Sequence, residues 1–296
     1  MTVQFDALLK QLEAGLELLP DKPEETPDST LRALWHAAAG HPLSAELAAD
    51  TPLAGLDVEA ESRLQELLTR RLGGTPLAHL TGRQRFMGME MLTGSGALIP
   101  RKETELLAGA AVDAARRVAA TVSQPLMVDV CTGSGNVALA VAHHVPTVRV
   151  FAADLSLEAV ELARQNARHL GLQNRVHFES GDLLQPFDTP AFHGRVDVLT
   201  CNPPYISTAK VGQMAGEISG HEPRLAFDGG PFGVAILMRL LEQAPRFLRD
   251  GGWLVFEVGL GQGGTLARRM EKGGGYRMVR PLQDSKGDIR AILAQR

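Results

Sequence analysis

The most chemically informative stretch of the sequence is Asn202-Pro203-Pro204-Tyr205. It follows the apolar run of residues 196–201, which predicts a buried strand that two consecutive prolines cannot continue. The chain must therefore leave the sheet there in a rigid, extended form. Ligand sites of open α/β sheets lie at the carboxyl ends of strands, so an amide, a fixed backbone and an aromatic ring at this position favour chemistry. The alternative is a strand-ending turn with a buried tyrosine.

A second candidate site is the turn of residues 129–136, which links a predicted strand to a predicted helix. Gly133 and Gly135 permit a tight turn and close approach of a ligand to the backbone. A plain helix-capping turn would have the same pattern, so this turn alone does not distinguish a cofactor site from a cap.

Two aspartates follow the next two predicted strands. Asp154 ends the second strand, where a carboxylate can hold a ribose by accepting hydrogen bonds from both of its hydroxyls. Asp154 could instead complement the dipole of the helix that Ser156 caps. Asp182 follows the third strand and could accept a hydrogen bond from an amine on a purine ring, or could be a turn residue.

These motifs help to distinguish hydride transfer with a nicotinamide cofactor from methyl transfer, two reactions that such a sheet can support. A nicotinamide site normally has Gly-x-Gly-x-x-Gly, and Ala138 takes the third glycine position, which the looser form of the motif permits. Asn202 to Tyr205 supply no acid for hydride transfer, whereas they suit an amino group that enters the site. The pattern therefore favours methyl transfer.

The elements that must position these residues alternate between strands and helices from Pro125 onward, after a helix near residues 104–120. This alternation predicts an α/β fold, a doubly wound, mostly parallel sheet of seven strands with helices on both faces. Strands are predicted near residues 126–130, 148–153, 176–178, 196–200 and 253–258, with two more apolar runs in 276–294, and further helices near 136–144, 156–170 and 232–248.

The first hundred residues have a different character. Residues 1–80 show helical leucine spacing, with a helix that Ser29-Thr30 caps and another from Val58 to Leu72, and they predict a small helical domain. Residues 81–100 predict a linking β-hairpin, in which Thr93–Gly96 forms the turn and Ala97–Pro100 the second strand. The domain containing the sheet then covers residues 101–296.

Bulk composition narrows the function classes. The net charge of −4 argues against a broad nucleic-acid-binding face. The two cysteines, Cys131 and Cys201, each end an apolar run and are predicted to be free thiols in a reducing compartment. No signal peptide, membrane span or metal-ligand cluster is evident, so the sequence predicts a cytoplasmic protein without a metal site.

Taken together, the motifs resemble class I S-adenosyl-L-methionine-dependent methyltransferases, whose sheet is Rossmann-like. More narrowly, the chain is similar to the HemK-type protein-glutamine N-methyltransferases that modify peptide chain release factors. The resemblance covers residues 60–296 well and residues 1–60 in outline. It is carried by residues 129–136, 153–156, 181–182 and 202–205, and more narrowly by 74–82, 98–105, 221–230 and 251–253.

The resemblance implies S-adenosyl-L-methionine as the cofactor and a glutamine side-chain amide as the acceptor. Asn202 and the Pro203 carbonyl would accept hydrogen bonds from the acceptor amide, and Tyr205 would pack against its plane; no strong general base is implied. The helical N-terminal domain would bind the protein substrate. The implied cofactor-binding residues are Asp129, Thr132, Gly133, Gly135, Asp154, Leu155, Asp182, Leu183 and Asn202, and the implied substrate-binding residues are Asn202, Pro203, Pro204, Tyr205, Arg101, Glu103 and Glu222.

The sequence also departs from the family pattern. Cys131 stands where the family usually has glycine, Lys102 and Glu103 where it more often has proline and aspartate, and His221 where it has tyrosine. A large-subunit ribosomal protein or a specialised small molecule therefore stays an alternative acceptor. Adenine in nucleic acid is a further alternative, and so is a non-catalytic cofactor-binding protein on the same fold.

Overall fold

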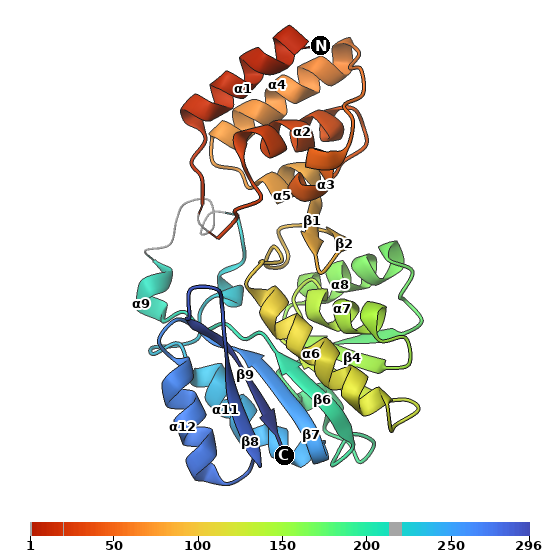
Figure 1. Ribbon diagram of the computed structural model, residues 1–296, viewed down its shortest axis with the longest axis vertical. Coiled ribbons are helices and arrows are strands. Elements are labelled where there is room, and N and C mark those ends of the chain that lie inside the picture. Colours follow the sequence, from red (N-terminus) through yellow and green to blue (C-terminus); the bar gives the residue numbers. More distant parts are fainter. Residues whose placement is uncertain (1, 20, 213–220) are drawn as a thin grey trace.

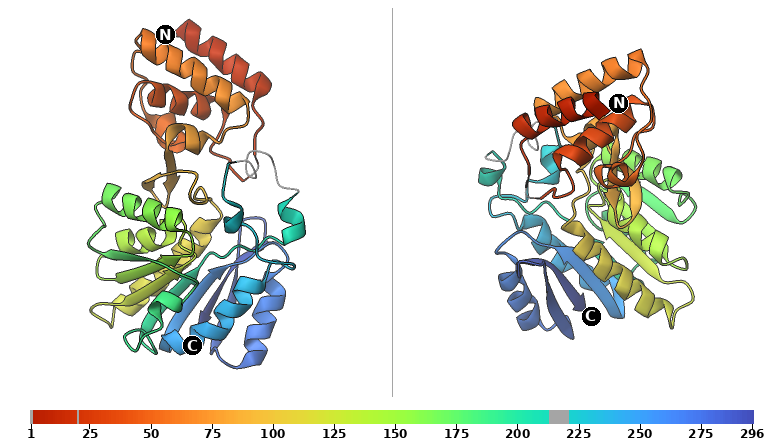
Figure 2. Two further views of the ribbon diagram at one scale, coloured as in Figure 1. Left: turned by 180° about the vertical axis from the view of Figure 1, so that it is seen from behind. Right: turned by 45° about the horizontal axis from the view of Figure 1, so that its top comes forward.

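The computed structural model describes residues 2–19, 21–212 and 221–296. A helical N-terminal part lies at one end of the molecule and a sheet flanked by helices at the other, with a small hairpin between them (Figure 1). Both views in Figure 2 show the same arrangement. No described helix combines the length and apolar character that crossing a membrane requires.

The N-terminal part buries an apolar core of its own. Leu12, Leu34 and Trp35 are almost fully buried, together with Leu64 and Leu68 of the helix that was predicted from residue 58 to 72. The helices of this part are α1 (Thr2–Gly15), α2 (Pro27–Ala38), α3 (Ala45–Asp50), α4 (Val58–Leu72) and α5 (Leu77–Thr81).

The start of α2 corrects one prediction. Its cap is Thr26 and not Ser29-Thr30: the Thr26 hydroxyl accepts from the Ser29 amide at 3.1 Å, and the Ser29 hydroxyl accepts from the Thr26 amide at 2.9 Å. Pro27 takes the first helical position, where its missing N–H costs nothing and its fixed φ suits a helix. The helix therefore begins before the serine that the sequence suggested as its cap.

The hairpin is also placed differently from its prediction. Its strands are β1 (Arg83–Phe86) and β2 (Met89–Leu92), so the turn is Met87-Gly88 and not Thr93–Gly96, and Ala97–Pro100 forms no strand. Met87 and Gly88 both have positive φ, as a two-residue hairpin turn requires. Methionine is an unusual residue there, and the Met87 amide donates to the Glu105 carboxylate at 2.8 Å. A contact from a later helix therefore supports a turn that lacks the usual sequence signal.

The sheet confirms the predicted fold class. Its seven strands are arranged in the order β5-β4-β3-β6-β7-β9-β8, and β9 runs in the direction opposite to that of the other six. The strands are β3 (Leu126–Val130), β4 (Arg149–Asp154), β5 (Val176–Ser180), β6 (Val196–Cys201), β7 (Leu248–Glu257), β8 (Met278–Gln283) and β9 (Ile289–Gln295), and the helices around them are α6 (Thr104–Ala119), α7 (Asn136–His144), α8 (Leu157–His169), α9 (Thr208–Val211), α11 (Ala235–Phe247) and α12 (Gly263–Gly273).

Two apolar layers hold the helices on the sheet. Side chains of α6, α7 and α8 pack on one face, and side chains of α11 and α12 pack on the other. The chain order reverses between β3 and β6, because β4 and β5 extend the sheet from β3 in one direction and β7 extends it from β6 in the other. A crevice at such a switch point is where open α/β sheets bind ligands.

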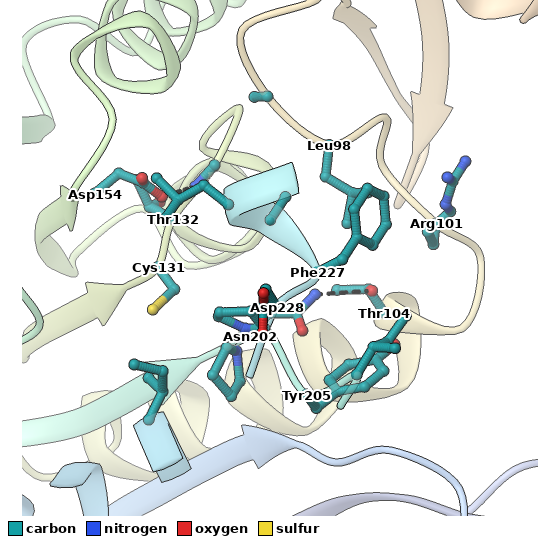
Figure 3. A pocket seen from close by; sticks show the side chains of 18 of the residues that line it. Leu98, Arg101, Thr104, Cys131, Thr132, Asp154, Asn202, Tyr205, Phe227 and Asp228 are labelled. Carbon is teal, nitrogen blue, oxygen red and sulfur yellow. Dashed lines mark hydrogen bonds between the residues drawn. The ribbon is translucent and has the colours of Figure 1, made fainter. Parts of the chain in front are cut away.

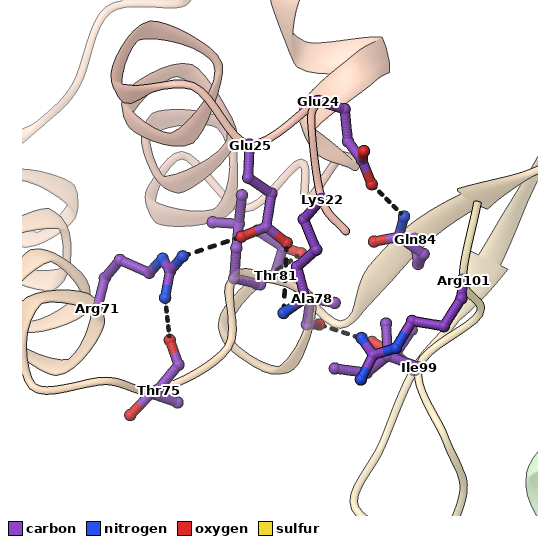
Figure 4. A network of polar contacts seen from close by, with 12 residues as sticks. Lys22, Glu24, Glu25, Arg71, Thr75, Ala78, Thr81, Gln84, Ile99 and Arg101 are labelled. Atoms are coloured by element: carbon purple, nitrogen blue, oxygen red, sulfur yellow. Dashed lines mark hydrogen bonds and ion pairs between the residues drawn. The ribbon is translucent and has the colours of Figure 1, made fainter. Parts of the chain in front are cut away.

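Polar contacts tie the hairpin to the helical part (Figure 4). Gln84 of β1 donates to Glu24 at 3.1 Å, beside a buried ion pair within the helical part, in which Arg71 of α4 contacts Glu25 at 2.9 Å. Lys102, just before α6, pairs with Glu46 of α3 at 2.6 Å. The domain limits at residues 80 and 100 stay a prediction: the Gln84–Glu24 contact crosses the first limit and the Lys102–Glu46 pair crosses both.

Candidate active site

A cavity of about 820 Å³ opens where the carboxyl ends of β3, β4, β5 and β6 meet (Figure 3). Its wall brings together almost all of the residues that the sequence singled out. These are Arg101, Glu103, Asp129, Thr132, Gly133, Asp154, Leu155, Asp182, Leu183, Asn202, Pro203, Pro204 and Tyr205, whereas Gly135 and Glu222 do not line it.

Asp129, near the end of β3, is a buried carboxylate at the floor of the cavity. It accepts hydrogen bonds from the Thr132 hydroxyl at 2.6 Å and from the Thr200 hydroxyl at 2.5 Å. Burial raises its pKa to about 6, against the effect of these two hydrogen bonds. A cationic ligand nearby would favour its ionised form.

Asp154 joins the end of β4 to the glycine turn. It accepts from the Gly133 amide at 2.8 Å and from the Ser156 amide at 2.9 Å, and burial raises its pKa. Asp154 therefore does support the start of α8, as one of its two interpretations predicted. Other lone pairs of the same carboxylate stay free for a ligand in the cavity.

Gly135 supports the turn from behind. It has a φ of +82° and precedes α7, and a side chain there would contact Ala163, Leu139 and Phe178 at 3.1 to 3.2 Å. Close packing of the turn on α8 and β5 therefore explains this glycine.

Asp182, after β5, has a partner that the sequence did not indicate. The Arg239 guanidinium of α11 donates to its carboxylate at 2.6 Å, and both side chains are close to half exposed. Leu183 beside it is buried with a positive φ of 49°. A purine amine would therefore share the Asp182 carboxylate with Arg239.

Asn202 leaves β6 with its side chain directed by Thr104, the first residue of α6. Its Nδ2 atom donates to the Thr104 hydroxyl at 3.3 Å (Figure 3). The side-chain oxygen of Asn202 is then the atom left to accept a hydrogen bond in the cavity, which Pro203 also lines.

Tyr205 leads to a group of residues that sequence reasoning missed. Its hydroxyl donates to the Glu257 carboxylate at 3.0 Å, and Arg290 of β9 pairs with Glu103 at 2.6 Å on the same side of the cavity. Glu257 is the single acidic residue in the apolar run 253–258, and it ends a strand next to β6. That position is the signal that could have identified it.

The Glu222 carboxylate lies behind the cavity wall. It accepts from Arg101 at 2.5 Å and from the Ile99 amide at 2.8 Å, and its side chain is fully buried. Arg224 is 70% exposed and lies 3.5 Å from Asp228, as a surface turn would place it. Residues 213–220 of this loop lie outside the described residues.

The structure also shows where Cys131, His221 and Lys102 lie, three residues that depart from the family pattern. Cys131 lines the cavity with a positive φ of 56°, the conformation that glycine adopts at least cost. His221 stacks edge-on against His79 with ring centroids 6.5 Å apart. Lys102 faces Glu46 and Glu105 and does not line the cavity.

Apolar side chains gather around the opening. Leu155, Leu225, Phe232 and Leu260 line the cavity and are 51% to 84% exposed, and they are most of the exposed large apolar side chains in the described part of the chain. Such a concentration marks a binding surface. The site as a whole therefore offers carboxylates and a glycine turn at one end, an amide and a carbonyl acceptor in the middle, and an apolar rim.

Comparisons with known proteins identify the family to which this chain is similar. A family model described as a methyltransferase domain matches residues 127–221. The release factor glutamine methyltransferase of Moorella thermoacetica is 39% identical over 237 residues, which cover 80% of this chain and 81% of that protein. The release factor glutamine methyltransferase of Vibrio cholerae is 32% identical over 295 residues, which cover 100% and 98%.

Among solved structures, the human Mettl16 catalytic domain superposes with a TM-score of 0.54 at 13% sequence identity. The superposition covers 70% of this chain and 76% of that chain. At this identity the likeness shows a shared methyltransferase fold alone.

Proposed function

The chain belongs to the family of release factor glutamine methyltransferases, and on this premise we propose that it transfers a methyl group from S-adenosyl-L-methionine to a glutamine side-chain amide of a peptide chain release factor. The observation that carries the proposal is the Asn202–Thr104 contact at 3.3 Å. It leaves the oxygen of Asn202 to accept from an N–H in the cavity, as an amide acceptor requires.

The cavity residues fit S-adenosyl-L-methionine. A volume of about 820 Å³ suits a cofactor of this size, and the buried Ser134 hydroxyl beside the turn lacks a partner among the described residues. When bound, this cofactor supplies an electrophilic methyl group on a positively charged sulfur. Asp129, Thr132 and Gly133 would hold its methionine portion on the turn that Gly135 packs into place, Asp154 and Leu155 its ribose, and Asp182 and Leu183 its adenine.

The chain's own residues orient the acceptor. An amide nitrogen is a weak nucleophile because its lone pair is delocalised into the carbonyl group. The Asn202 oxygen and the Pro203 carbonyl would accept its two N–H groups, which holds the nitrogen in line for attack. Pro203 and Pro204 fix the backbone, and Tyr205 packs against the amide plane.

The cavity's remaining wall would contact the rest of the substrate. Arg101 and Glu103 line it from the segment before α6, and Glu222 acts on the substrate through Arg101, which it pairs with at 2.5 Å. The net charge of −4 suits a protein acceptor better than nucleic acid. The two free thiols suit the cytoplasm, where we place the reaction.

A transfer assay tests the proposal. The protein is incubated with methyl-labelled S-adenosyl-L-methionine and, in parallel, with release factor, large-subunit ribosomal proteins and bulk nucleic acid, and mass spectrometry locates the label. We expect label on a release factor glutamine, and a rate of labelling lower by about 100-fold or more with Asn202→Ala. Label on another acceptor alone, or cofactor binding without any transfer, would contradict the proposed substrate.

A further inference from the structure

A buried polar cluster lies behind Tyr205, at the carboxyl end of β7. Glu257 is 2% exposed and accepts a hydrogen bond from the Tyr205 hydroxyl at 3.0 Å. The Thr104 hydroxyl also lies against Glu257 and favours its ionised form. Glu103 and Arg290 complete the charged groups that face it.

Two of these neighbours lead directly to the acceptor position. Thr104 accepts from Asn202 at 3.3 Å, and Tyr205 follows the two prolines. The Tyr205 backbone is held as well, because Gln262 donates to its carbonyl at 3.0 Å. The carboxylate at β7 is thus the hydrogen-bond partner of Tyr205, and Thr104, the partner of Asn202, lies beside it.

We propose that Glu257 is a positioning residue for methyl transfer, which acts through the hydroxyl of Tyr205 to hold Tyr205 and the adjoining Asn202-Pro203-Pro204 segment in the orientation that receives the acceptor glutamine. This inference rests on the proposed function. An ionised carboxylate only accepts hydrogen bonds, so the Tyr205 hydroxyl must donate to it. Thr104, beside this carboxylate, accepts from Nδ2 of Asn202 and so leaves the Asn202 oxygen for the cavity.

Burying the Glu257 carboxylate costs free energy, which supports a role for it beyond packing. The rest of the run from Trp253 to Phe256 is apolar and buried, and a carboxyl group in such a strand is expensive unless its partners are in place. Its Oε2 atom lacks a hydrogen-bond partner among the described residues. An apolar residue would stabilise the strand at lower cost, so the acid is best explained by the site beside it.

The protonation state of Glu257 provides a direct readout. Burial raises its pKa to about 7, helped by the neighbouring Glu103 charge and opposed by Thr104, Tyr205 and Arg290. Protonation turns one of its oxygens into a donor, so the hydrogen bond from Tyr205 should change near neutral pH. The chain has two tyrosines, Tyr205 and Tyr276, so Tyr276→Phe leaves one tyrosine signal.

The first experiment follows that signal without any acceptor. Tyrosine labelled at ring carbon Cζ is incorporated into Tyr276→Phe protein, and its chemical shift is recorded from pH 5 to 9. We expect a titration with a midpoint near 7 that disappears in Glu257→Gln. A flat curve in the parent, or the same curve in Glu257→Gln, would overturn the proposal whatever the protein methylates.

The second experiment measures transfer to release factor. Glu257→Gln should lower kcat by roughly 10- to 100-fold with an unchanged dissociation constant for S-adenosyl-L-methionine. In the parent, ionisation of Glu257 should make kcat rise through neutral pH, and Glu257→Gln should lack this rise. Asp197→Asn is the matched control, because Asp197 is another buried acid of the sheet with an arginine partner, Arg249, outside the site. It should keep the pH profile.

A conservative variant covers the case in which Glu257→Gln does not fold. Tyr205→Phe keeps the ring and removes only the hydroxyl, so it should lower kcat without changing the melting temperature by more than Asp197→Asn does. Unchanged kcat in Tyr205→Phe would overturn the proposal. If the unmodified protein transfers no methyl group to release factor, the proposed substrate fails, and the tyrosine titration still decides whether Glu257 holds Tyr205.

Discussion

Asn202 at the end of β6 donates its side-chain amide to Thr104 at the start of α6, 3.3 Å away and 98 residues earlier in the sequence. The contact assigns the nitrogen of Asn202 to the protein and its oxygen to the cavity. It therefore turns a strand-ending residue into an oriented hydrogen-bond acceptor, and it gives α6 a part in the site.

Removing either partner should slow methyl transfer without abolishing cofactor binding. Asn202→Ala loses an acceptor for the substrate amide, and we expect kcat to fall by about 100-fold or more. Thr104→Val keeps the shape of the side chain and loses its lone pairs, so a smaller fall of roughly 10-fold is expected. Steady-state kinetics with labelled S-adenosyl-L-methionine measures both.

The control for these two variants is Thr121→Val, beyond the far end of α6, where the threonine hydroxyl donates to the Val118 carbonyl. It should leave kcat unchanged. A full rate in Thr104→Val would show that Asn202 needs no partner to hold its orientation.

Asp154→Asn should weaken binding of S-adenosyl-L-methionine. The carboxylate accepts from the Gly133 and Ser156 amides at 2.8 and 2.9 Å and keeps lone pairs toward the cavity. An amide can replace one oxygen only, and the loss of a charged hydrogen bond predicts a dissociation constant about 10- to 100-fold higher. Isothermal titration calorimetry measures it, with the exposed Glu158→Gln as control; equal affinity in both variants would argue against a ribose contact at Asp154.

Glu222→Gln should destabilise the fold around the site. Glu222 and Arg101 are both buried and 2.5 Å apart, so neutralising the acid leaves the guanidinium charge without its counter-ion. Breaking a buried pair in this way predicts a loss of about 3 kcal/mol in the free energy of unfolding. Urea unfolding measures it, and Arg224→Ala, which removes an exposed arginine of the same loop, should change almost nothing. Similar small effects in both would mean that the Glu222 pair is not needed for stability.

The sequence predicted the frame of the site well because its signals are local. The apolar run 126–130, the helix of residues 136–144 and the helix from Val58 to Leu72 each lie where predicted. The carboxyl ends of successive strands meet at one edge of a parallel sheet, so residues chosen strand by strand were expected to lie together. Thirteen of those residues line one cavity, although their roles stay proposals.

What the sequence did not show depends on contacts between distant segments. Arg239 reaches Asp182 from α11, and no local pattern pairs them. The turn at Met87 is supported by Glu105 of α6, so its residues lack the usual hairpin signal. Glu257 had a local signal, an acid ending an apolar strand, but its partner Tyr205 and its neighbour Thr104 are apparent only once β6, β7 and α6 are packed together.

Glu257 also makes the stability of the fold depend on pH. Burial raises the pKa of its carboxyl from 4.5 to about 7, so the folded protein binds this proton more tightly than the unfolded chain does. The resulting stabilisation is complete below pH 4.5 and is lost as the pH rises through 7. Glu257→Gln carries no such proton. Asp129, whose pKa is raised to about 6, makes the same contribution to the pH dependence of the free energy of unfolding in both proteins, so that contribution cancels in their difference.

The free energy of unfolding of the parent should therefore fall relative to that of Glu257→Gln by about 2–3 kcal/mol between pH 5 and pH 8, because each pKa unit corresponds to 1.36 kcal/mol. Urea unfolding of both proteins across this range measures the difference. Asp197→Asn again serves as the matched control, and its difference from the parent should lack a step centred near pH 7. A flat difference for Glu257→Gln would mean that the carboxyl is already ionised in the folded protein well below neutral pH, and the pH dependence expected for Tyr205 would then be absent as well.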